Sequence, residues 1–561
     1  MSYVKKSITY MKTFRCSVLM LLALFCSVGE SSACTNLIVG KKASKDGSVI
    51  CTYNCDGFGF AGSLSYFPAG RHLKGEKIAI DGWGPRKEGQ YVDQVEYTYG
   101  VIGLMNENQV SIVETTFDGR LELVNEDGLL DYYTLMQLAL QRSTTAREAI
   151  QWMTDLVDEY GYNSSGETIT ICDKEEAWIM EIIGKGAGRK GAVWVALRVP
   201  DDCICAHANL SRIRQFPLHD KANCLYAKDV ISFAREQGYY TGKDSDFSFR
   251  DAYCPIDFEN VRYADARVYS FFRHHVADKA EMDQYLPYIN GDFEQCDHLP
   301  LWIKPDTLVD VKGIMADMRD HFEGTPLDMT ADVSAGPWGM PIRPLPMTYK
   351  DSEGNPMFRE RPIATQQSGM TMVCQMRSWL PDEVGGVLWF NCDDANMVAY
   401  VPVFCSVNVV PDPFRRENNP HREFSEKSAF WMNNFVANMI YPRYSLMIGD
   451  LRDAQSELET YYATDIDSVA QAIVPMTKGE RIAFLTHKSA AYAERMMTRW
   501  DRLARMLIVK HNDQVVYPTE NGKFTGGRYQ TPGYNQPFID AISRGTGTRY
   551  KLDQLIERRE R

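Results

Sequence analysis

The chain has 561 residues, of which 44% are hydrophobic and 24% are charged, and its formal net charge is −13. This length allows a large core, and the composition is that of an ordinary water-soluble globular protein. A net negative charge argues against binding to nucleic acid or to an anionic membrane surface, since both need basic patches.

The first 33 residues have the pattern of a secretory signal peptide. Basic residues precede an apolar run over residues 18–28, and the small residues Ser31 and Ala33 stand at positions −3 and −1 of a cleavage point. Translation from Met11 would also give a complete signal peptide. The apolar run is shorter than the ~20 residues that cross a bilayer. We therefore expect an exported protein, periplasmic or extracellular, with no stable membrane insertion after cleavage. The basic residues are Lys5, Lys6, Lys12 and Arg15.

Cleavage after Ala33 would make Cys34 the new N-terminus, with a thiol and an α-amine on one residue. A thiol has a pKa of ~8.5 and an α-amine one of ~7.7–8.0, so near neutral pH the neutral amine can take the thiol proton. The pattern favours a nucleophilic cysteine. Two alternatives stay open. One is a lipoprotein lipidated at Cys34, although Ser31 stands where such proteins usually carry an apolar residue; the other is a disulfide cysteine.

Residues 34–210 are expected to form short strands around a pair of helices. Runs rich in β-formers and bounded by turn residues predict the strands, and apolar residues at three- and four-residue spacing predict the helices. Strands that flank a helical pair are typical of a sheet with helices layered on it. The strands are expected at 35–40, 49–54, 110–116, 168–172, 177–183 and 192–198, and the helices at 130–141 and 145–160.

The rest of the chain changes from mixed to helical character. We expect a catalytic domain over residues 34–420 and a helical C-terminal extension with a polar tail over residues 421–561. The elements behind this division are an aromatic-rich stretch at 214–349 with a helix at 225–237, strands within 371–410, a Pro- and Arg-rich connector at 411–420, helices at 425–460 (interrupted at Pro442) and 478–508, and a polar, Gly-rich tail from 521.

Motifs of cofactor and metal sites are absent or stand in the wrong context. Residues 186–191 fit G-x-G-x-x-G, but a predicted strand follows rather than a helix, so a hairpin turn is expected. The close pairs Cys51/Cys55 and Cys203/Cys205 each lack a second pair at zinc spacing. We expect no cofactor and no metal. Cysteines within strand-like runs read as small buried residues, so few disulfides are expected.

Motifs in order along the chain resemble the dipeptidase A family of cysteine peptidases, in the N-terminal nucleophile hydrolase superfamily. The first covers residues 34–56, with the cysteine, a Lys-Ala-Ser-x-Asp-Gly-Ser turn and an Asn-x-Asp on the second strand. Any one motif is weak, whereas the ordered set is specific and spans most of the mature chain. The other motifs are at 105–107, 113–117, 176–181, 197–202, 206–213, 336–339, 375–377 and 380–381.

This resemblance implies an α+β fold, a four-layer αββα N-terminal nucleophile hydrolase sandwich, and it implies roles for residues. Cys34 is the expected nucleophile, Asp56 the carboxylate that orients its protonated amine, and Asn209 an amide donor to the oxyanion. Further candidates from the same motifs each also suit a structural position, such as a cap or a turn. They are Asn54, Asn106, Thr116 and Arg212.

The expected activity is that of an exported cysteine dipeptidase, which hydrolyses short peptides through a thioester on Cys34. The alternative within the fold is an amidase or acylase acting on N-acyl amides or cell-wall peptide fragments. Bile-salt hydrolases and penicillin V acylases carry Arg where this chain has Tyr53, and Tyr cannot hold a thiolate by charge. This difference weakens the acylase alternative. Short peptides are the expected partners, nucleic acid is not, and homo-oligomerisation is left open.

Overall fold

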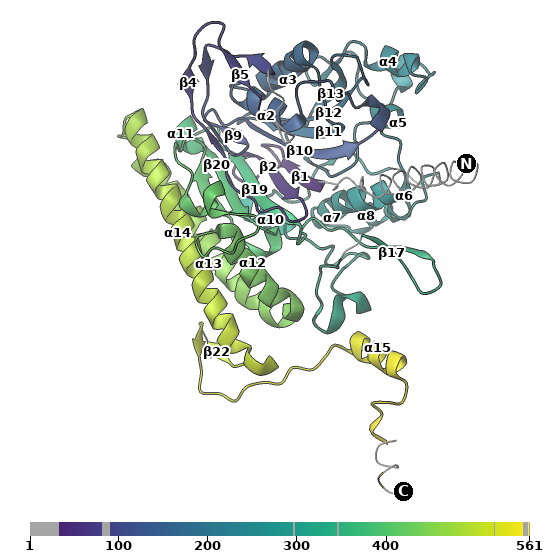
Figure 1. Cartoon of the computed structure of the whole chain (residues 1–561), viewed down its shortest axis with the longest axis vertical. Coiled ribbons are helices and arrows are strands. Elements are labelled where there is room, and N and C mark those ends of the chain that lie inside the picture. Colours follow the sequence, from purple (N-terminus) through teal and green to yellow (C-terminus); the bar gives the residue numbers. More distant parts are fainter. Residues whose placement is uncertain are drawn as a thin grey trace, which may run out of the picture.

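The computed structural model describes residues 33–80, 90–294, 298–344, 347–520, 522–553 and 559. The predicted signal peptide, apart from Ala33, lies outside the described residues. The described chain has a mixed α/β fold with two large antiparallel sheets, helices against them and a helical C-terminal region (Figure 1). The predicted α+β character is confirmed.

A seven-stranded sheet contains β1 (Ala33–Val39) in its interior. β1 pairs in antiparallel register with β2 (Val49–Asp56) on one side and with β14 (Ile204–His207) on the other. The outer strands come from much later in the chain. The order is β16, β14, β1, β2, β19, β20, β21, and the remaining bounds are β16 (Trp302–Ile303), β19 (Ser368–Met376), β20 (Gly386–Cys392) and β21 (Val401–Phe404).

An eight-stranded sheet contains the other predicted strands of the first half of the chain. Residues 186–191 form the turn between β12 and β13, and Gly186, Gly188 and Gly191 all have positive φ there, so the predicted hairpin is confirmed. The order is β15, β13, β12, β11, β10, β9, β8, β3, with β3 (Tyr66–Phe67), β8 (Val101–Ile102), β9 (Met105–Asn106), β10 (Ser111–Asp118), β11 (Gly166–Cys172), β12 (Ala177–Gly184), β13 (Ala192–Arg198) and β15 (Cys224–Tyr226).

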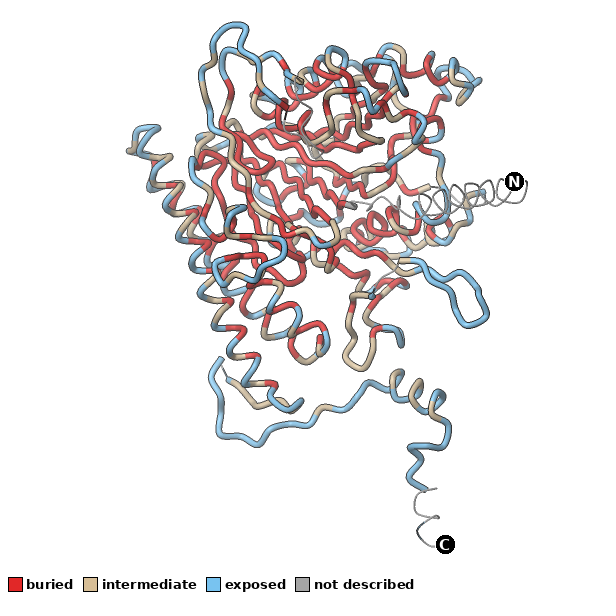
Figure 2. Tube along the Cα trace, viewed as in Figure 1, coloured by how far each residue is buried: buried red, intermediate tan, exposed pale blue. Residues whose placement is uncertain are grey.

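The two sheets face each other, with β1 and β2 packed on β10. Helices α2 (Tyr132–Leu140) and α3 (Ala146–Tyr160) contact β10, β11 and β13 of the eight-stranded sheet. On the other side of the molecule, helices of the C-terminal region contact β20 and β21 of the seven-stranded sheet (Figure 1). Buried residues concentrate in both sheets and in the helix faces against them (Figure 2). The central strands of both sheets are therefore shielded from water.

The turn between β1 and β2 is closed by Asp46. Its carboxylate accepts hydrogen bonds from the Ser44 hydroxyl (2.8 Å), the Ser48 hydroxyl (2.6 Å) and the Ser48 amide (3.0 Å). Gly47 follows with φ +83°, which a residue with a side chain rarely adopts. The Lys-Ala-Ser-x-Asp-Gly-Ser motif thus serves to pair β1 with β2.

The C-terminal helices confirm the predicted elements closely. α12 (Ala429–Ile440) and α13 (Tyr444–Ala472) are separated at Pro442, and α14 (Lys478–Lys510) begins with a capping box between Thr477 and Glu480. α12 and α14 pack directly on β20 and β21, and their apolar residues join the same core. The boundary near residue 420 stays a prediction.

One expectation from the sequence was wrong. The helix predicted at 225–237 begins only with α4 (Val230–Glu236), because Leu225 and Tyr226 pair with β13 as the edge strand β15. The polar tail contains a helix, α15 (Gln536–Thr546), which starts at an Asn535 cap and contacts residues 333–338.

The remaining elements are short. Each of the described cysteines is a free thiol. Among the described helices, none is both long and apolar enough to cross a membrane. The bounds are β4 (Gly70–Arg71), β5 (Lys77–Ala79), β6 (Tyr91–Asp93), β7 (Tyr97–Thr98), α5 (Phe249–Tyr253), α6 (Phe258–Asn260), α7 (Ala266–His274), α8 (Ala280–Asp283), α9 (Leu286–Ile289), α10 (Val311–Asp317), β17 (Thr348–Lys350), β18 (Pro356–Phe358), α11 (Asp382–Gly385), β22 (Thr519–Glu520) and β23 (Lys523–Phe524).

Candidate functional site

Cys34 lies near the start of β1, and its side chain points into the space between the two sheets. The residue is 1% exposed. Its Sγ lies 3.4 Å from the Tyr53 hydroxyl and 3.6 Å from Glu114 Oε1. The Tyr53 hydroxyl in turn donates a hydrogen bond of 2.6 Å to the same Glu114 oxygen. The thiol therefore faces one phenol and one carboxyl, and no histidine is among these contacts.

The backbone nitrogen of Cys34 meets a different group of side chains. It donates to Asn209 Oδ1 (3.3 Å), which also accepts from Arg267 (2.9 Å). Arg267 donates in addition to the Cys34 carbonyl (2.8 Å) and to the Thr35 hydroxyl (2.6 Å). The amide nitrogen of Asn209 donates to the Thr116 carbonyl (2.8 Å). Because that nitrogen carries two hydrogens, one remains for a further acceptor.

Asp56 lies at the end of β2, opposite Ala33 in the β1–β2 register. Its carboxylate accepts from Arg361 (3.1 Å) and from the Ser368 hydroxyl (2.5 Å). Burial raises the pKa of Asp56 to about 6, against the opposing effect of Arg361 and the Ser368 hydrogen bond. A carboxylate at this position is beside the Ala33–Cys34 peptide bond.

The raised pKa of Asp56 predicts a specific dependence of stability on pH. Between pH 3.8 and about 6 the folded state holds this proton while the unfolded state does not, so the free energy of unfolding falls as pH rises through that window. An Asp56→Asn variant should lack this contribution, which amounts to up to roughly 3 kcal/mol. Urea unfolding of both proteins at pH 4 and pH 7 measures the difference; a constant difference would contradict the shift.

Two buried carboxyls form an acidic pair beside the thiol. Glu114 on β10 and Glu167 on β11 hydrogen-bond to each other, and Glu167 also accepts from the Thr116 hydroxyl (2.9 Å). Burial raises the pKa of Glu114, and burial and repulsion from Glu114 raise the pKa of Glu167 further. Two such groups cannot both ionise readily, because a charge on one disfavours a charge on the other.

These surroundings disfavour a resting thiolate. Burial, a hydrogen bond with Cys55 and the charge of Glu114 all raise the pKa of the Cys34 thiol. The nearby cation is Arg267, whose own pKa burial lowers to about 9. A thiol of this kind needs a base that takes its proton at the moment of reaction, rather than a permanent cation.

The structure brings some of the predicted site residues together and leaves others apart. Cys34, Asn209 and the main chain of Thr116 meet at one end of β1, with Asp56 at the neighbouring strand end. Asn54, by contrast, bonds to the Ile363 carbonyl (2.9 Å) and to Thr371 (2.5 Å). It therefore holds β2 against residues 363–371, away from the thiol.

Asn106 and Arg212 also have structural partners. The Asn106 side chain donates to two backbone carbonyls (both 2.8 Å) and accepts from two backbone amides (2.9 and 3.0 Å), which ties β9 to the loop after α2. Arg212 pairs with Asp265 at 2.9 Å, directly before α7. Since α7 carries Arg267, Arg212 can position that cation without touching the thiol itself.

Sequence reasoning missed several residues of this site. Glu114 was part of a recognised motif but received no role, and Glu167, Arg267, Arg361 and Ser368 were not singled out. A signal did exist for some. Arg267 stands on the helix face that also carries the buried Phe271, and Glu114 and Glu167 stand within buried strands, where a charge needs a partner. Nothing in the local sequence marks Arg361 or Ser368.

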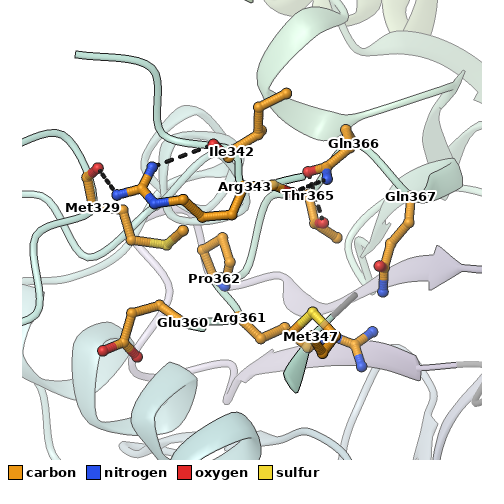
Figure 3. A pocket seen from close by; sticks show the side chains of 10 residues that line it. All are labelled: Met329, Ile342, Arg343, Met347, Glu360, Arg361, Pro362, Thr365, Gln366 and Gln367. Atoms are coloured by element: carbon orange, nitrogen blue, oxygen red, sulfur yellow. Dashed lines mark hydrogen bonds between the residues drawn. The ribbon is translucent and has the colours of Figure 1, made fainter. Parts of the chain in front are cut away.

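Two cavities open near the site. One, of about 440 Å³, has a mixed lining of apolar and polar residues. It includes Met370 and Met372, which pair with Cys55 and Tyr53 across the β2–β19 register. Because Cys34 pairs with Cys55, this cavity lies on the thiol face of the sheet. The second pocket is smaller, and its lining includes Arg361, the residue that pairs with Asp56. Figure 3 shows Arg343 and Arg361 among its lining side chains. Within the described residues no cluster of three or more His, Cys, Asp or Glu could hold a metal ion.

Comparisons with known proteins point to one family. The model of the family described as "Peptidase family C69" matches residues 84–457, more than half of the chain. A "Probable dipeptidase" of Latilactobacillus sakei is 25% identical over 502 residues, covering 85% of this chain and 95% of its own length. A "Probable dipeptidase B" of Lactococcus lactis is 26% identical over 504 residues, with 86% and 96% covered. A "Dipeptidase A" of Lactobacillus helveticus is 23% identical over 454 residues, with 76% and 85% covered.

Proposed function

Because this chain belongs to peptidase family C69 and is a cysteine-type peptide hydrolase, we propose that it is an exported dipeptidase whose mature N-terminus is Cys34. One observation carries this proposal. The Cys34 nitrogen donates to Asn209, which also accepts from Arg267, while the thiol lies against Tyr53 and Glu114, so both functional groups of one residue are held in place. The relatives' names support dipeptides as the substrate class.

The proposed reaction follows from these positions. The neutral α-amine of Cys34 takes the thiol proton as Sγ attacks the carbonyl carbon of the peptide bond. The bond to the leaving amine then breaks, and the protonated α-amine returns the proton to it, which leaves a thioester on Cys34. Water, deprotonated by the same amine, attacks the thioester carbonyl. The C–S bond then breaks, the carboxylic acid product leaves, and the protonated amine returns its proton to the Cys34 sulfur. The second amide hydrogen of Asn209 is the proposed donor to the oxyanion.

We propose further that the fold is the four-layer αββα sandwich of N-terminal nucleophile hydrolases. Two facing antiparallel sheets with helices against each of them support a four-layer αββα arrangement of the N-terminal nucleophile type. The position of Cys34 on an interior strand fits that type, since its nucleophile must stand at the start of a strand between the sheets.

Burial of the thiol weighs against a lipoprotein. A diacylglyceryl group on Sγ would have to displace Tyr53 and Glu114 from a residue that is 1% exposed. Intact-mass spectrometry of the mature protein separates the two possibilities. We expect the mass of a chain that begins with unmodified Cys34, whereas a diacylglyceryl adduct would refute the enzyme proposal.

Substrate preference provides the second test. We expect hydrolysis of a panel of dipeptides with free α-amines to exceed that of penicillin V and of conjugated bile acids by at least about tenfold in kcat/KM, because Tyr53 replaces the arginine of the acylases. Chelators should leave the rate unchanged, and thiol reagents should stop it. A preference for the acylated amides would instead favour the amidase alternative.

A further inference from the structure

We infer that the cavity of about 440 Å³ on the thiol face holds the C-terminal residue of the substrate, and that Arg416 binds the α-carboxylate of that residue. This inference rests on the proposed dipeptidase function and deepens it, because it names the residues that would recognise a free C-terminus. The volume is within the range of ~300–1,000 Å³ that is typical of small-molecule sites.

A row of neighbouring side chains leads from the thiol to this cavity. Cys34 lies opposite Cys55 in the β1–β2 register, and Cys55 lies opposite Met370 in the β2–β19 register. Side chains directly opposite each other on paired strands share one face and lie about 5 Å apart. Met370, which lines the cavity, is therefore about 10 Å from Cys34 along the sheet.

This separation suits the second residue of a dipeptide. The carbonyl carbon under attack stands about 3–3.5 Å from Sγ of Cys34. One further residue of extended chain adds about 3.5 Å, so the α-carboxylate lies about 7 Å from Sγ. A guanidinium that pairs with it stands about 3 Å farther away. The cavity thus begins where the C-terminal residue of a bound dipeptide would lie.

Arg416 comes to the cavity from residues 411–420, the segment that the sequence predicts as a connector. The backbone amide of Leu64 donates to the Phe414 carbonyl (2.8 Å), which ties this segment to the loop after β2. Asn419 is buried and donates to two backbone carbonyls of the same segment (2.7 and 2.9 Å). The backbone that carries Arg416 is therefore fixed beside the cavity.

The cavity offers positive charge without a matching acid. Its described lining contains Arg416 and His421 and no Asp or Glu. The Arg416 side chain is exposed and makes no hydrogen bond or ion pair with another described residue. Nδ1 of His421 lies 3.3 Å from the Ala61 amide and 3.4 Å from the Gly59 carbonyl, while Nε2 has no hydrogen-bond partner in the part of the chain that the structure describes. Because arginine binds carboxylates through two parallel N–H bonds, an α-carboxylate fits this place.

The rest of the lining predicts which C-terminal residue is preferred. Leu64, Leu104, Met370 and Met372 contribute apolar surface to the cavity. Methionine side chains adapt to the shape of what they contact. Burial of a leucine side chain in such a cavity should favour a leucine-ended dipeptide over a glycine-ended one by roughly 10- to 100-fold in kcat/KM.

The first test compares a leucine-ended dipeptide with its C-terminal amide, which loses the negative charge and keeps the scissile bond. We expect the wild-type mature enzyme to prefer the free acid by roughly 10- to 100-fold in kcat/KM, mainly through KM, since a charge-assisted pair is lost in the amide. In Arg416→Met, which keeps an unbranched side chain without the charge, this ratio should fall to near one.

The matched control is Arg422→Met. Arg422 is also exposed and lies outside the described lining of the cavity. The substitution removes the same charge from the same part of the surface, so it should keep the wild-type ratio of acid to amide. A ratio that falls equally in both variants would show a general effect of charge rather than a contact, and would overturn the role of Arg416.

A second measurement does not depend on turnover. Calorimetric titration of Cys34→Ala with the dipeptide and with its amide gives two dissociation constants, and the acid should bind roughly 10- to 100-fold more tightly. Addition of Arg416→Met should bring the two constants close together. Equal constants in Cys34→Ala alone would contradict the carboxylate subsite.

A third measurement tests the cavity itself. Ser63 lines it from the loop after β2, and Ser63→Phe places a ring where the substrate side chain would lie. This variant should lose more kcat/KM for a leucine-ended dipeptide than for a glycine-ended one. An unchanged preference between the two substrates would refute the assignment of this cavity.

The outcomes separate this inference from the proposed function. Equal hydrolysis of acid and amide by the wild-type enzyme, or an unchanged ratio in Arg416→Met, would overturn the carboxylate subsite and leave the dipeptidase intact. Absence of dipeptide hydrolysis in the wild-type mature enzyme would instead refute the proposed function itself.

Discussion

Replacing Cys34 by Ala is expected to abolish peptide hydrolysis, with a loss of turnover of roughly 10⁶-fold, the scale seen when a nucleophile is removed from a hydrolase. The substitution deletes a single buried sulfur that contacts Tyr53 and Glu114, so the fold should persist. Dipeptide hydrolysis and the circular dichroism spectrum of the purified mature variant provide the two readouts. Full activity in Cys34→Ala would refute the proposal that Cys34 is the nucleophile.

The matched control is Cys205→Ala. Cys205 is also buried, lies on β14 directly beside β1, and bonds to the Leu301 carbonyl rather than to any residue around Cys34. Turnover should survive this change. A mature chain that retains one extra residue before Cys34 should also be inactive with its thiol intact, because an amide nitrogen is no base. Activity of the extended chain would show that a different group takes the thiol proton.

Asn209→Ala is expected to lower turnover by about 10²–10³, the usual effect of losing one oxyanion donor. Two contributions are removed together, the acceptor for the Cys34 nitrogen and the donor proposed for the oxyanion. The Michaelis constant should change less than turnover, because the proposed contact with the oxyanion forms only as the transition state is reached. Steady-state kinetics on one dipeptide measures both constants.

Asn106→Ala tests whether such an effect is specific. Asn106 is a buried asparagine with four hydrogen bonds to backbone, two within the turn after β9 and two to the segment at the end of α2. Its removal should lower the melting temperature clearly, whereas the folded fraction should turn over normally. If Asn209→Ala instead behaves like Asn106→Ala, then Asn209 is a structural residue and the assignment of its role is wrong.

Much of the fold could be predicted because the informative patterns are local. The hydrophobic periodicity, the capping residues and the turn residues lie within the segment itself for strands β10 to β13 and for helices α2, α3 and α14. The break at Pro442 was visible for the same reason. α4 was placed too early because Leu225 and Tyr226 satisfy a helical spacing as well as a strand, and only the presence of β13 at the sheet edge decides between them.

The candidate site was predictable only in part. Cys34 stands out through the residues around it, and Asp56 and Asn209 belong to motifs close to strands that neighbour β1. Arg267, Glu167 and Ser368 come to the site from other segments, and their roles depend on pairing partners that no local pattern specifies. The sequence shows that Tyr53 stands where related enzymes carry an arginine. Only the tertiary structure shows that Arg267 brings a cation to Cys34 instead.

The strand order of the seven-stranded sheet has a consequence for biosynthesis. β2 follows β1 directly in the chain, yet its other edge is paired by β19, which begins only at Ser368. Until that segment has been made, β2, which pairs with the strand of Cys34, presents an open edge. Contacts of such long sequence separation form slowly. We therefore expect nascent chains and N-terminal fragments that end before β19 to be inactive and prone to aggregation, because β2, which carries Asp56, has no partner on that side.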